Sequence, residues 1–150
     1  MTQRSDKVTT KAARSDTHGT DPGYAAFVER VWTHYHEHGR DLPWRRARDP
    51  YAVLVSEVML QQTQVPRVAP KYEAFLEAFP TPAALAGAPL DELLRVWSGL
   101  GYNRRALNLK RAAEAIVAEH GGRVPDTLEA LTALPGIGHA TAAQVLAFAF

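Results

Sequence analysis

Cysteine is absent from this 150-residue sequence. A disulfide framework and a metal or iron–sulfur site built on thiolates are therefore excluded, so we expect this chain to bind no such cofactor by itself. An apolar run long enough to cross a bilayer is also missing, as is an apolar leader at the N-terminus. We expect a cytoplasmic location, with no signal peptide and no membrane partner.

The sequence also lacks strand-like alternation, an internal repeat and a glycine-rich nucleotide loop. Its 17 Lys and Arg nearly balance its 16 Asp and Glu, so the net charge of +1 indicates no class of partner. Apolar residues recur at helical spacing in successive segments, which predicts an all-α fold with short loops. We expect one domain over residues 24–150, after a polar, disordered tail over residues 1–23.

The first predicted helix runs from Tyr24 to His38 and ends at Gly39. Its apolar positions are Phe27, Val31 and Tyr35. Three histidines alternate near its end, and we expect that they do not share one helix face and are solvated rather than metal-bound. These histidines are His34, His36 and His38.

The stretch from Asp49 to Gln64 organises the chain. It predicts a helix with proline only in its first turn, where proline is tolerated. The apolar positions of this helix are Leu54, Val55, Val58 and Met59. Glu57 lies among them, and a carboxyl group in apolar surroundings has a raised pKa that suits a general acid. The alternative is that Glu57 faces solvent.

Two segments combine basic side chains with an aromatic ring. Residues 40–48 form a predicted loop with several arginines around Trp44, which either contacts phosphates and stacks on a base or anchors the loop to the core. Tyr102 precedes a helix whose first part carries four cations and no acid, the pattern of a phosphate-contacting surface. These cations are Arg104, Arg105, Lys110 and Arg111.

The segment Leu134–Gly138 predicts a tight turn that leads into a last helix. Backbone N–H groups at such a turn, with the positive end of the helix dipole, bind phosphate, although the turn by itself also fits an ordinary connection.

The sequence also contains signals for the starts of two other helices. Pro70 should kink or delay the helix after Thr63, and Asp126 with Glu129 has the spacing of a capping box.

Five motifs in this order resemble the MutY-type adenine DNA glycosylases of the helix-hairpin-helix superfamily. The motifs are Leu42–Arg45, Pro50–Tyr51, Ser56–Thr63, Gly99–Tyr102 and Leu134–Gly138. The resemblance covers roughly residues 24–150. It implies the superfamily's fold, half of a six-helix barrel here, and removal of adenine mispaired with 8-oxoguanine or guanine in double-stranded DNA.

The resemblance also implies roles for individual residues. Glu57 matches the catalytic acid that protonates adenine at N7. Side chains that touch the flipped adenine or the opposite base match Leu42, Trp44, Arg45, Gln62, Thr63, Leu100 and Tyr102. Gly136, Ile137 and Gly138 match the phosphate-binding hairpin, which in this superfamily can also hold a monovalent cation. We expect a monomer associated with a bacterial nucleoid.

The sequence departs from the family pattern in three ways. Ala140 stands where lyase members carry lysine, so Schiff-base chemistry is excluded at this position. The family's aspartate after the hairpin has no counterpart, and neither do the four cysteines of its iron–sulfur cluster or its C-terminal recognition domain. We therefore expect an incomplete catalytic domain, weakly active or inactive on its own. A thymine glycosylase for G·T mismatches and a non-catalytic DNA-binding fragment are the alternatives.

Overall fold

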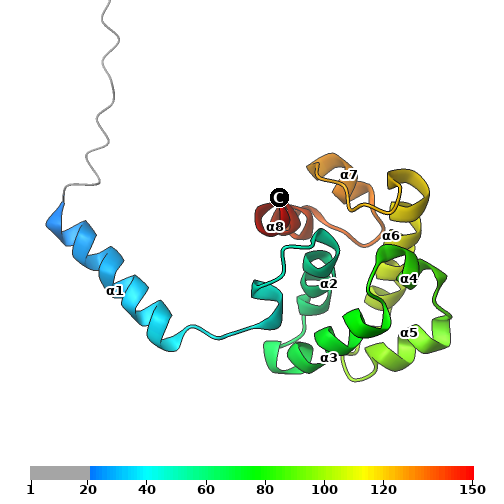
Figure 1. The fold of residues 1–150 in the computed structure, drawn as a ribbon, viewed down its shortest axis with the longest axis horizontal. Helices are drawn as coiled ribbons and strands as arrows, with labels where there is room; N and C mark the ends of the chain where they lie inside the picture. Colours follow the sequence, from blue (N-terminus) through cyan, green and yellow to red (C-terminus); the bar gives the residue numbers. More distant parts are fainter. Residues whose placement is uncertain (1–20) are drawn as a thin grey trace, which may run out of the picture. The chain divides into compact units, whose positions relative to one another are not determined.

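A computed structural model describes residues 21–150, and every regular element in this range is helical (Figure 1). The elements are α1 (Pro22–His38), the 3-10 helix η2 (Pro43–Arg45), α2 (Pro50–Leu60), α3 (Val65–Ala78), α4 (Pro82–Gly87), α5 (Leu90–Trp97), α6 (Arg104–His120), α7 (Leu128–Ala133) and α8 (His139–Ala149). The all-α prediction is confirmed. None of these helices combines the length and the apolarity needed to cross a bilayer.

The chain divides after Arg40 into two compact units, which are described separately. In the first unit α1 begins at Pro22, because the Asp21 carboxylate accepts a hydrogen bond from the N–H of Gly23 and caps the helix. The last residues of the predicted tail therefore belong to the start of a helix. Residues 1–20 lie outside the described part of the chain, so the prediction of a disordered tail remains a prediction.

Helix α1 forms where the sequence predicts it, yet it buries none of its residues within its own unit. The apolar face includes Phe27 and Trp32, which are 58% and 57% exposed. The prediction that its histidines share no face is wrong for one pair. His34 and His38 lie four residues apart, so their rings stack with centroids at 4.4 Å.

Helix α2 is the core helix of the second unit, residues 41–150. It starts where the Asp49 carboxylate accepts hydrogen bonds from the N–H groups of Tyr51 and Ala52, with Pro50 in the first turn. Nearly every side chain of α2 is buried, because α3, α6, α8 and η2 all pack against it (Figure 1). A helix that is apolar on all sides is expected to be buried in this way.

Helices α3 to α6 build the rest of the core. Helix α3 runs through Pro70 without a delayed start, contrary to one of the two outcomes expected for this proline. Helix α4 packs on α6, where the Lys110 ammonium donates hydrogen bonds to the carbonyl oxygens of Leu85 and Ala86 at the end of α4. Edge-to-face rings join α3 to α5 through Phe75 and Trp97, whose centroids are 6.0 Å apart.

Helices α7 and α8 flank the turn at residues 134–138. Thr127, not Asp126, caps α7, because its hydroxyl oxygen accepts a hydrogen bond from the N–H of Ala130 at 3.2 Å. Helix α8 packs against both α7 and α2. This packing places α8, the helix that follows the turn, against the helix that carries Glu57.

Candidate active site

Glu57 is the one charged side chain of α2, and its carboxyl group is half-buried. Loss of hydration raises its pKa above the ordinary value for glutamate. Within residues 21–150 no hydrogen bond or ion pair holds the carboxylate in its charged form. Such a group keeps its proton to higher pH than an exposed glutamate and can donate it to a substrate atom.

Residues 42–45 lie against the same helix. Leu42 is extended and buried, while the following three residues form η2, a 3-10 turn where the sequence predicted an extended loop. Pro43 favours this turn because its φ is fixed near the helical value. The half-buried Trp44 ring meets the ring of Tyr72 edge-on, with centroids 5.6 Å apart, and Arg45 is exposed. This packing fits the interpretation in which Trp44 anchors the segment to the core.

In the loop of residues 61–64, which follows α2, the three polar side chains of residues 61–63 have different surroundings. Gln61 donates from Nε2 to the hydroxyl oxygen of Thr141 in α8, at 3.0 Å. The Thr63 hydroxyl lies 3.4 Å from the carbonyl oxygen of Gln61, to which it donates, and it is half-buried. Gln62 is exposed and takes a left-handed backbone conformation, with φ at 54°. Of the three, Gln62 is the side chain most open to a ligand.

The loop of residues 99–103, between α5 and α6, also uses left-handed backbone. Gly99, Gly101 and Tyr102 have φ values of 92°, 72° and 47°. The Tyr102 side chain is 65% exposed, whereas Leu100 is 2% exposed and belongs to the core. The predicted contact of Tyr102 with DNA is therefore compatible with its exposure. For Leu100 the contact remains a prediction, since in the DNA-free structure this side chain is buried in the core.

Gln62 and Tyr102 line one pocket of about 360 Å³, together with Gln61, Asn103, Arg104 and Arg105. The structure thus brings two segments that are distant in the sequence to one surface depression. The two residues of this pocket that have positive φ, Gln62 and Tyr102, are not glycines. Such backbone costs about 1–3 kcal/mol and is concentrated at functional sites.

The guanidinium group of Arg105 bonds to several groups of the protein. Its Nη1 donates to the carbonyl oxygens at the end of α2, at 3.1 Å to Val58 and 2.9 Å to Met59, and also to that of Gln61. Its Nη2 donates to the Thr63 hydroxyl at 2.8 Å. These carbonyl groups lie at the C-terminal end of α2, where that of Val58 also accepts a hydrogen bond from the N–H of Gln61, so Arg105 adds to the cap of α2. Burial lowers the pKa of Arg105, but an arginine remains charged.

The other loop contributes further acceptors to the same guanidinium group. Nη2 of Arg105 lies 3.4 Å and 3.3 Å from the carbonyl oxygens of Leu100 and Gly101. Trp97 donates from its ring N–H to the Gly101 carbonyl at 3.0 Å, and Arg67 donates to the Gly99 carbonyl at 2.6 Å. The structure uses this side chain inside the protein, and a contact between Arg105 and a DNA phosphate remains a prediction.

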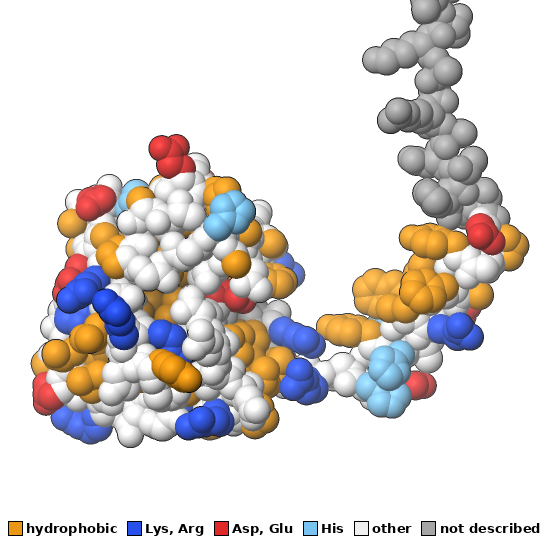
Figure 2. Space-filling model, turned by 180° about the vertical axis from the view of Figure 1, so that it is seen from behind, with side chains coloured by type: hydrophobic (Ala, Val, Ile, Leu, Met, Phe, Trp, Pro, Cys, Tyr) orange, Lys and Arg blue, Asp and Glu red, His pale blue; other side chains and the backbone are white. Residues whose placement is uncertain are grey.

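The other three cations of the predicted basic stripe on α6 also differ in how far they are exposed to solvent. Lys110 bonds to the end of α4 and to Glu114, at 3.2 Å, while Arg104 and Arg111 are exposed. Lys and Arg side chains are spread over the face of the second unit shown in Figure 2. Arg104 and Arg111 therefore remain the members of this stripe that an anionic ligand can reach.

The turn at residues 134–138 contains the second candidate binding element. Gly136 has φ at 76°, and a Cβ at this position would lie 2.7 Å from Cβ of Asn108 in α6. Ile137 is buried and fixes the turn to the core. Gly138 is exposed, precedes the first turn of α8 and has free space around it. The backbone at Gly138 can therefore approach a ligand closely.

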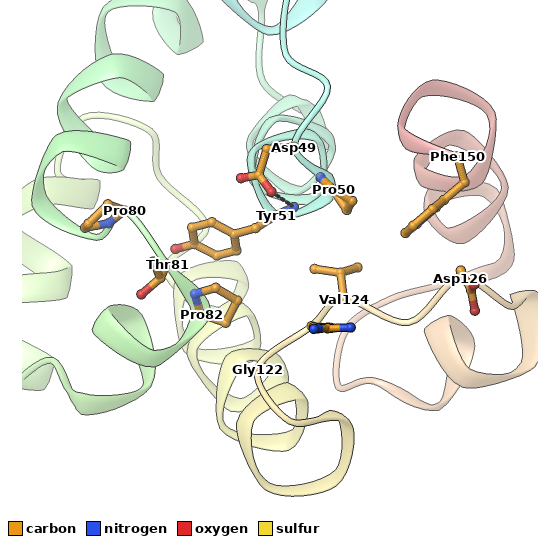
Figure 3. Close-up of a pocket in the computed structure, with 11 residues that line it drawn as sticks. Asp49, Pro50, Tyr51, Pro80, Thr81, Pro82, Gly122, Val124, Asp126 and Phe150 are labelled. Atoms are coloured by element: carbon orange, nitrogen blue, oxygen red, sulfur yellow. Dashed lines mark hydrogen bonds between the residues drawn. The ribbon is translucent and has the colours of Figure 1, made fainter.

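A larger pocket of about 480 Å³ lies elsewhere, among Asp49, Tyr51, Thr81, Arg123, Asp126 and Phe150 (Figure 3). Two of its polar groups already have partners, since Asp49 caps α2 and the Tyr51 hydroxyl donates to the Phe79 carbonyl at 3.0 Å. The pocket contains neither Glu57 nor any residue for which a DNA contact is predicted. We therefore place the candidate site at Glu57, the two loops and the turn.

The family model described as "HhH-GPD superfamily base excision DNA repair protein" matches residues 55–147. The chain belongs to the HhH-GPD superfamily. The match begins two residues before Glu57 and includes both loops and the turn at 134–138. Residues 42–45 lie outside it.

Three curated relatives of this HhH-GPD chain are named adenine DNA glycosylase. The one from Buchnera aphidicola (Baizongia pistaciae strain) is 42% identical over 125 residues, which are 83% of this chain and 36% of the relative. The relative from Rattus norvegicus is 44% identical over 134 residues, which are 83% of this chain and 26% of the relative. The relative from Mycobacterium tuberculosis is 44% identical over 117 residues, which are 77% of this chain and 38% of the relative. The chain thus spans about a quarter to two fifths of the length of these relatives.

Solved structures show the same fold. A thermostable thymine-DNA glycosylase is 34% identical, with a TM-score of 0.75, and the match covers 84% of this chain and 58% of that one. A non-covalent endonuclease III–DNA complex has a TM-score of 0.68 at 24% identity, with 84% and 59% covered, and shows the fold alone. The predicted helix-hairpin-helix glycosylase fold is therefore confirmed.

The HhH-GPD chain does not fit an iron–sulfur cluster, because it has no cysteine and no three His, Asp or Glu side chains converge within residues 21–150. No step of the chemistry below passes through such a group. The possible monovalent cation at the turn and the monomeric state remain predictions.

Sequence reasoning missed the internal role of Arg105 and the bond between Gln61 and Thr141. Both link segments that are distant in the sequence, so neither leaves a local signal.

Proposed function

We propose that this protein is a DNA glycosylase that removes adenine paired with 8-oxoguanine or guanine from double-stranded DNA. The position of Glu57 carries the proposal. It is half-buried on a helix that is otherwise buried, burial raises its pKa, and no cation within residues 21–150 holds it ionised. The adenine DNA glycosylases that are 42–44% identical to this chain support adenine as the base.

The reaction is hydrolysis of the N-glycosidic bond of a flipped adenosine. Glu57 donates its proton to N7 of adenine, and the electron pair of the breaking bond leaves on the base. The deoxyribose gains oxocarbenium character, and the oxygen of a water molecule then bonds to C1′ and loses a proton. Ala140 offers no amine, so no Schiff base forms at this position.

We assign a different role in DNA binding to each of three parts of the candidate surface. Gln62 and Tyr102, exposed at one pocket, are proposed to enter the duplex beside the opposite base. The backbone at Gly136 to Gly138, at the start of α8, is proposed to hold a phosphate. Trp44, which its edge-on contact with Tyr72 also holds to the core, and the exposed Arg45 are proposed to line the adenine pocket, beside the core helix that carries Glu57.

Glu57→Gln tests the proposed chemistry in the full-length protein. The substitution keeps the shape of the side chain but removes the acidic proton, so single-turnover release of adenine should fall by about 10²–10⁴-fold while binding to the A·8-oxoguanine duplex persists. The wild-type rate should decline as pH rises through the raised pKa of Glu57, because the acid must be protonated.

The matched control is Glu73→Gln, an exposed glutamate of α3, which should leave base release and its pH profile unchanged. Base release near the wild-type rate in the Glu57→Gln protein would mean that Glu57 is only structural.

A thymine glycosylase acting on G·T mismatches is the second candidate, because a thymine-DNA glycosylase shares this fold at 34% identity. Single-turnover assays on A·8-oxoguanine and T·G duplexes separate the two. Thymine release without adenine release would replace the proposal, and lesion binding with release of neither base would favour a non-catalytic DNA-binding protein.

A further inference from the structure

Two residues with strained backbone line the pocket of about 360 Å³. Gln62, with φ at 54°, belongs to the loop of residues 61–64, and Tyr102, with φ at 47°, belongs to the loop of residues 99–103. A non-glycine residue stays left-handed only where surrounding contacts over-determine its backbone. The contacts that both loops share are those of Arg105.

One guanidinium group bonds to both loops. Arg105 reaches the carbonyl of Gln61 and the hydroxyl of Thr63 on one side, and the carbonyl groups of Leu100 and Gly101 on the other. Because it also bonds to the last carbonyl groups of α2, the end of the helix that carries Glu57 is tied to the same group.

Two aromatic rings also lie close to this guanidinium group. The Cζ atom of Arg105 lies 5.4 Å from the centroid of the Trp97 ring and 5.7 Å from that of Tyr102. A planar fork with several N–H groups can bond in two directions while it stacks on rings, and the compact ammonium of lysine cannot reproduce this. The geometry therefore requires arginine rather than positive charge alone.

We propose that Arg105 is a positioning residue that holds the two loops in one arrangement, so that Gln62 and Tyr102 meet a lesion together. This role rests on the proposed glycosylase function, because it assigns lesion recognition to the two loops. Arg105 acts on the lesion through these loops and does not touch the DNA.

Arg105→Lys separates this role from a phosphate contact, because lysine keeps the charge but not the fork. The first measurement is hydrogen exchange by mass spectrometry on the DNA-free protein. The reporting amides are those of Gln61 and Thr63 in the first loop, of Leu100 in the second loop and of Arg105 at the start of α6, each of which donates a backbone hydrogen bond. Exchange should accelerate in both loops, while α4 and the middle of α6 keep their protection.

The second measurement is lesion selectivity, the ratio of Kd for an A·T duplex to Kd for an A·8-oxoguanine duplex, in a Glu57→Gln background that prevents base release. Arg105→Lys should lower this ratio about tenfold, the scale of one lost hydrogen bond to a charged group. The dependence of Kd on salt should stay the same, because a lysine would preserve any phosphate contact.

The matched control is Arg95→Lys, an exposed arginine paired with Asp91 at 3.3 Å on α5, which should change neither measurement. Protection and selectivity that both survive in Arg105→Lys would overturn the proposal, and so would faster exchange in one loop only. Loss of protection throughout α2 to α8 would also overturn it, because Arg105 would then support the whole core. If the unaltered protein shows no lesion selectivity, the proposed function fails, while hydrogen exchange still decides whether Arg105 couples the loops.

Discussion

The turn at residues 134–138 and the two loops joined by Arg105 both use left-handed backbone, but different residues supply it. In the turn the residue is Gly136, which adopts positive φ without steric cost and lies close against Asn108. In the loops Gly99 and Gly101 share this conformation with Gln62 and Tyr102, and the strain at the two non-glycine residues is offset by contacts from elsewhere in the fold. A left-handed position that offers only its backbone can be glycine, whereas a position that offers a side chain to a ligand cannot.

The largest expected effect concerns the turn. Gly136→Ala forces left-handed backbone on alanine and places a Cβ 2.7 Å from that of Asn108, so the free energy of unfolding should fall by about 2–4 kcal/mol. Gly138→Ala is the control, because Gly138 has negative φ and free space, and it should cost less than about 1 kcal/mol. Chemical denaturation of both variants measures the difference. Equal losses would show that Gly136 is not held against α6.

Tyr102→Ala removes the exposed ring of the second loop. If the ring stacks beside the opposite base, discrimination between 8-oxoguanine and guanine should weaken by about 1–3 kcal/mol. Competition binding with A·8-oxoguanine and A·G duplexes measures this change. An equal loss of affinity on undamaged duplex would indicate that Tyr102 only supports the fold, through its contact with Arg105.

The third prediction tests the link between the two regions. Thr141, at the start of α8, accepts a hydrogen bond from Gln61 of the first loop, and Thr141→Val should leave the Gln61 amide without a partner. The free energy of unfolding should fall by about 1–2 kcal/mol. Thr132→Val is the control, since Thr132 is exposed and bonds only within α7, and it should have little effect. Indistinguishable melts of the two variants would show that this link adds nothing to stability.

The smallest expected effect is a gain, rather than a loss, in the free energy of unfolding. Gln62→Gly relieves the left-handed strain but adds chain entropy, so we expect a stabilisation below about 1 kcal/mol. Gln144→Gly, on the exposed side of helix α8, should instead destabilise the protein by about 1 kcal/mol. Thermal melts of the two variants compare the signs. A destabilised Gln62→Gly protein would mean that the Gln62 side chain itself stabilises the loop.

Local chemistry allowed several elements to be predicted from the sequence. Asp49 and Pro50 mark the start of α2 because a carboxylate caps the first N–H groups and proline fits the first turn. The raised pKa of Glu57 follows from its apolar neighbours, and the turn follows from Gly136 and Gly138. Boundaries were less certain, as the shift of the α7 cap from Asp126 to Thr127 shows.

Charge and exposure were harder to predict. Arg105 and Lys110 were grouped with Arg104 and Arg111 by their spacing along α6, yet the first two donate hydrogen bonds to carbonyl groups of other segments. Leu100 was expected at the DNA surface and belongs to the core. In each case the deciding partner comes from a segment that is distant in the sequence.

The sequence by itself determined that the chain is helical and where α2 begins. It also determined that Glu57 lies among apolar residues of this helix. Helix capping, apolar periodicity and the polarity of neighbouring residues are all local properties of the chain. Only the tertiary structure decided which cations are available to a ligand. It also decided that the loops of residues 61–64 and 99–103 share one pocket. A guanidinium group binds whichever carbonyl groups the packing of helices brings to it, and that packing depends on the whole core rather than on the residues beside it.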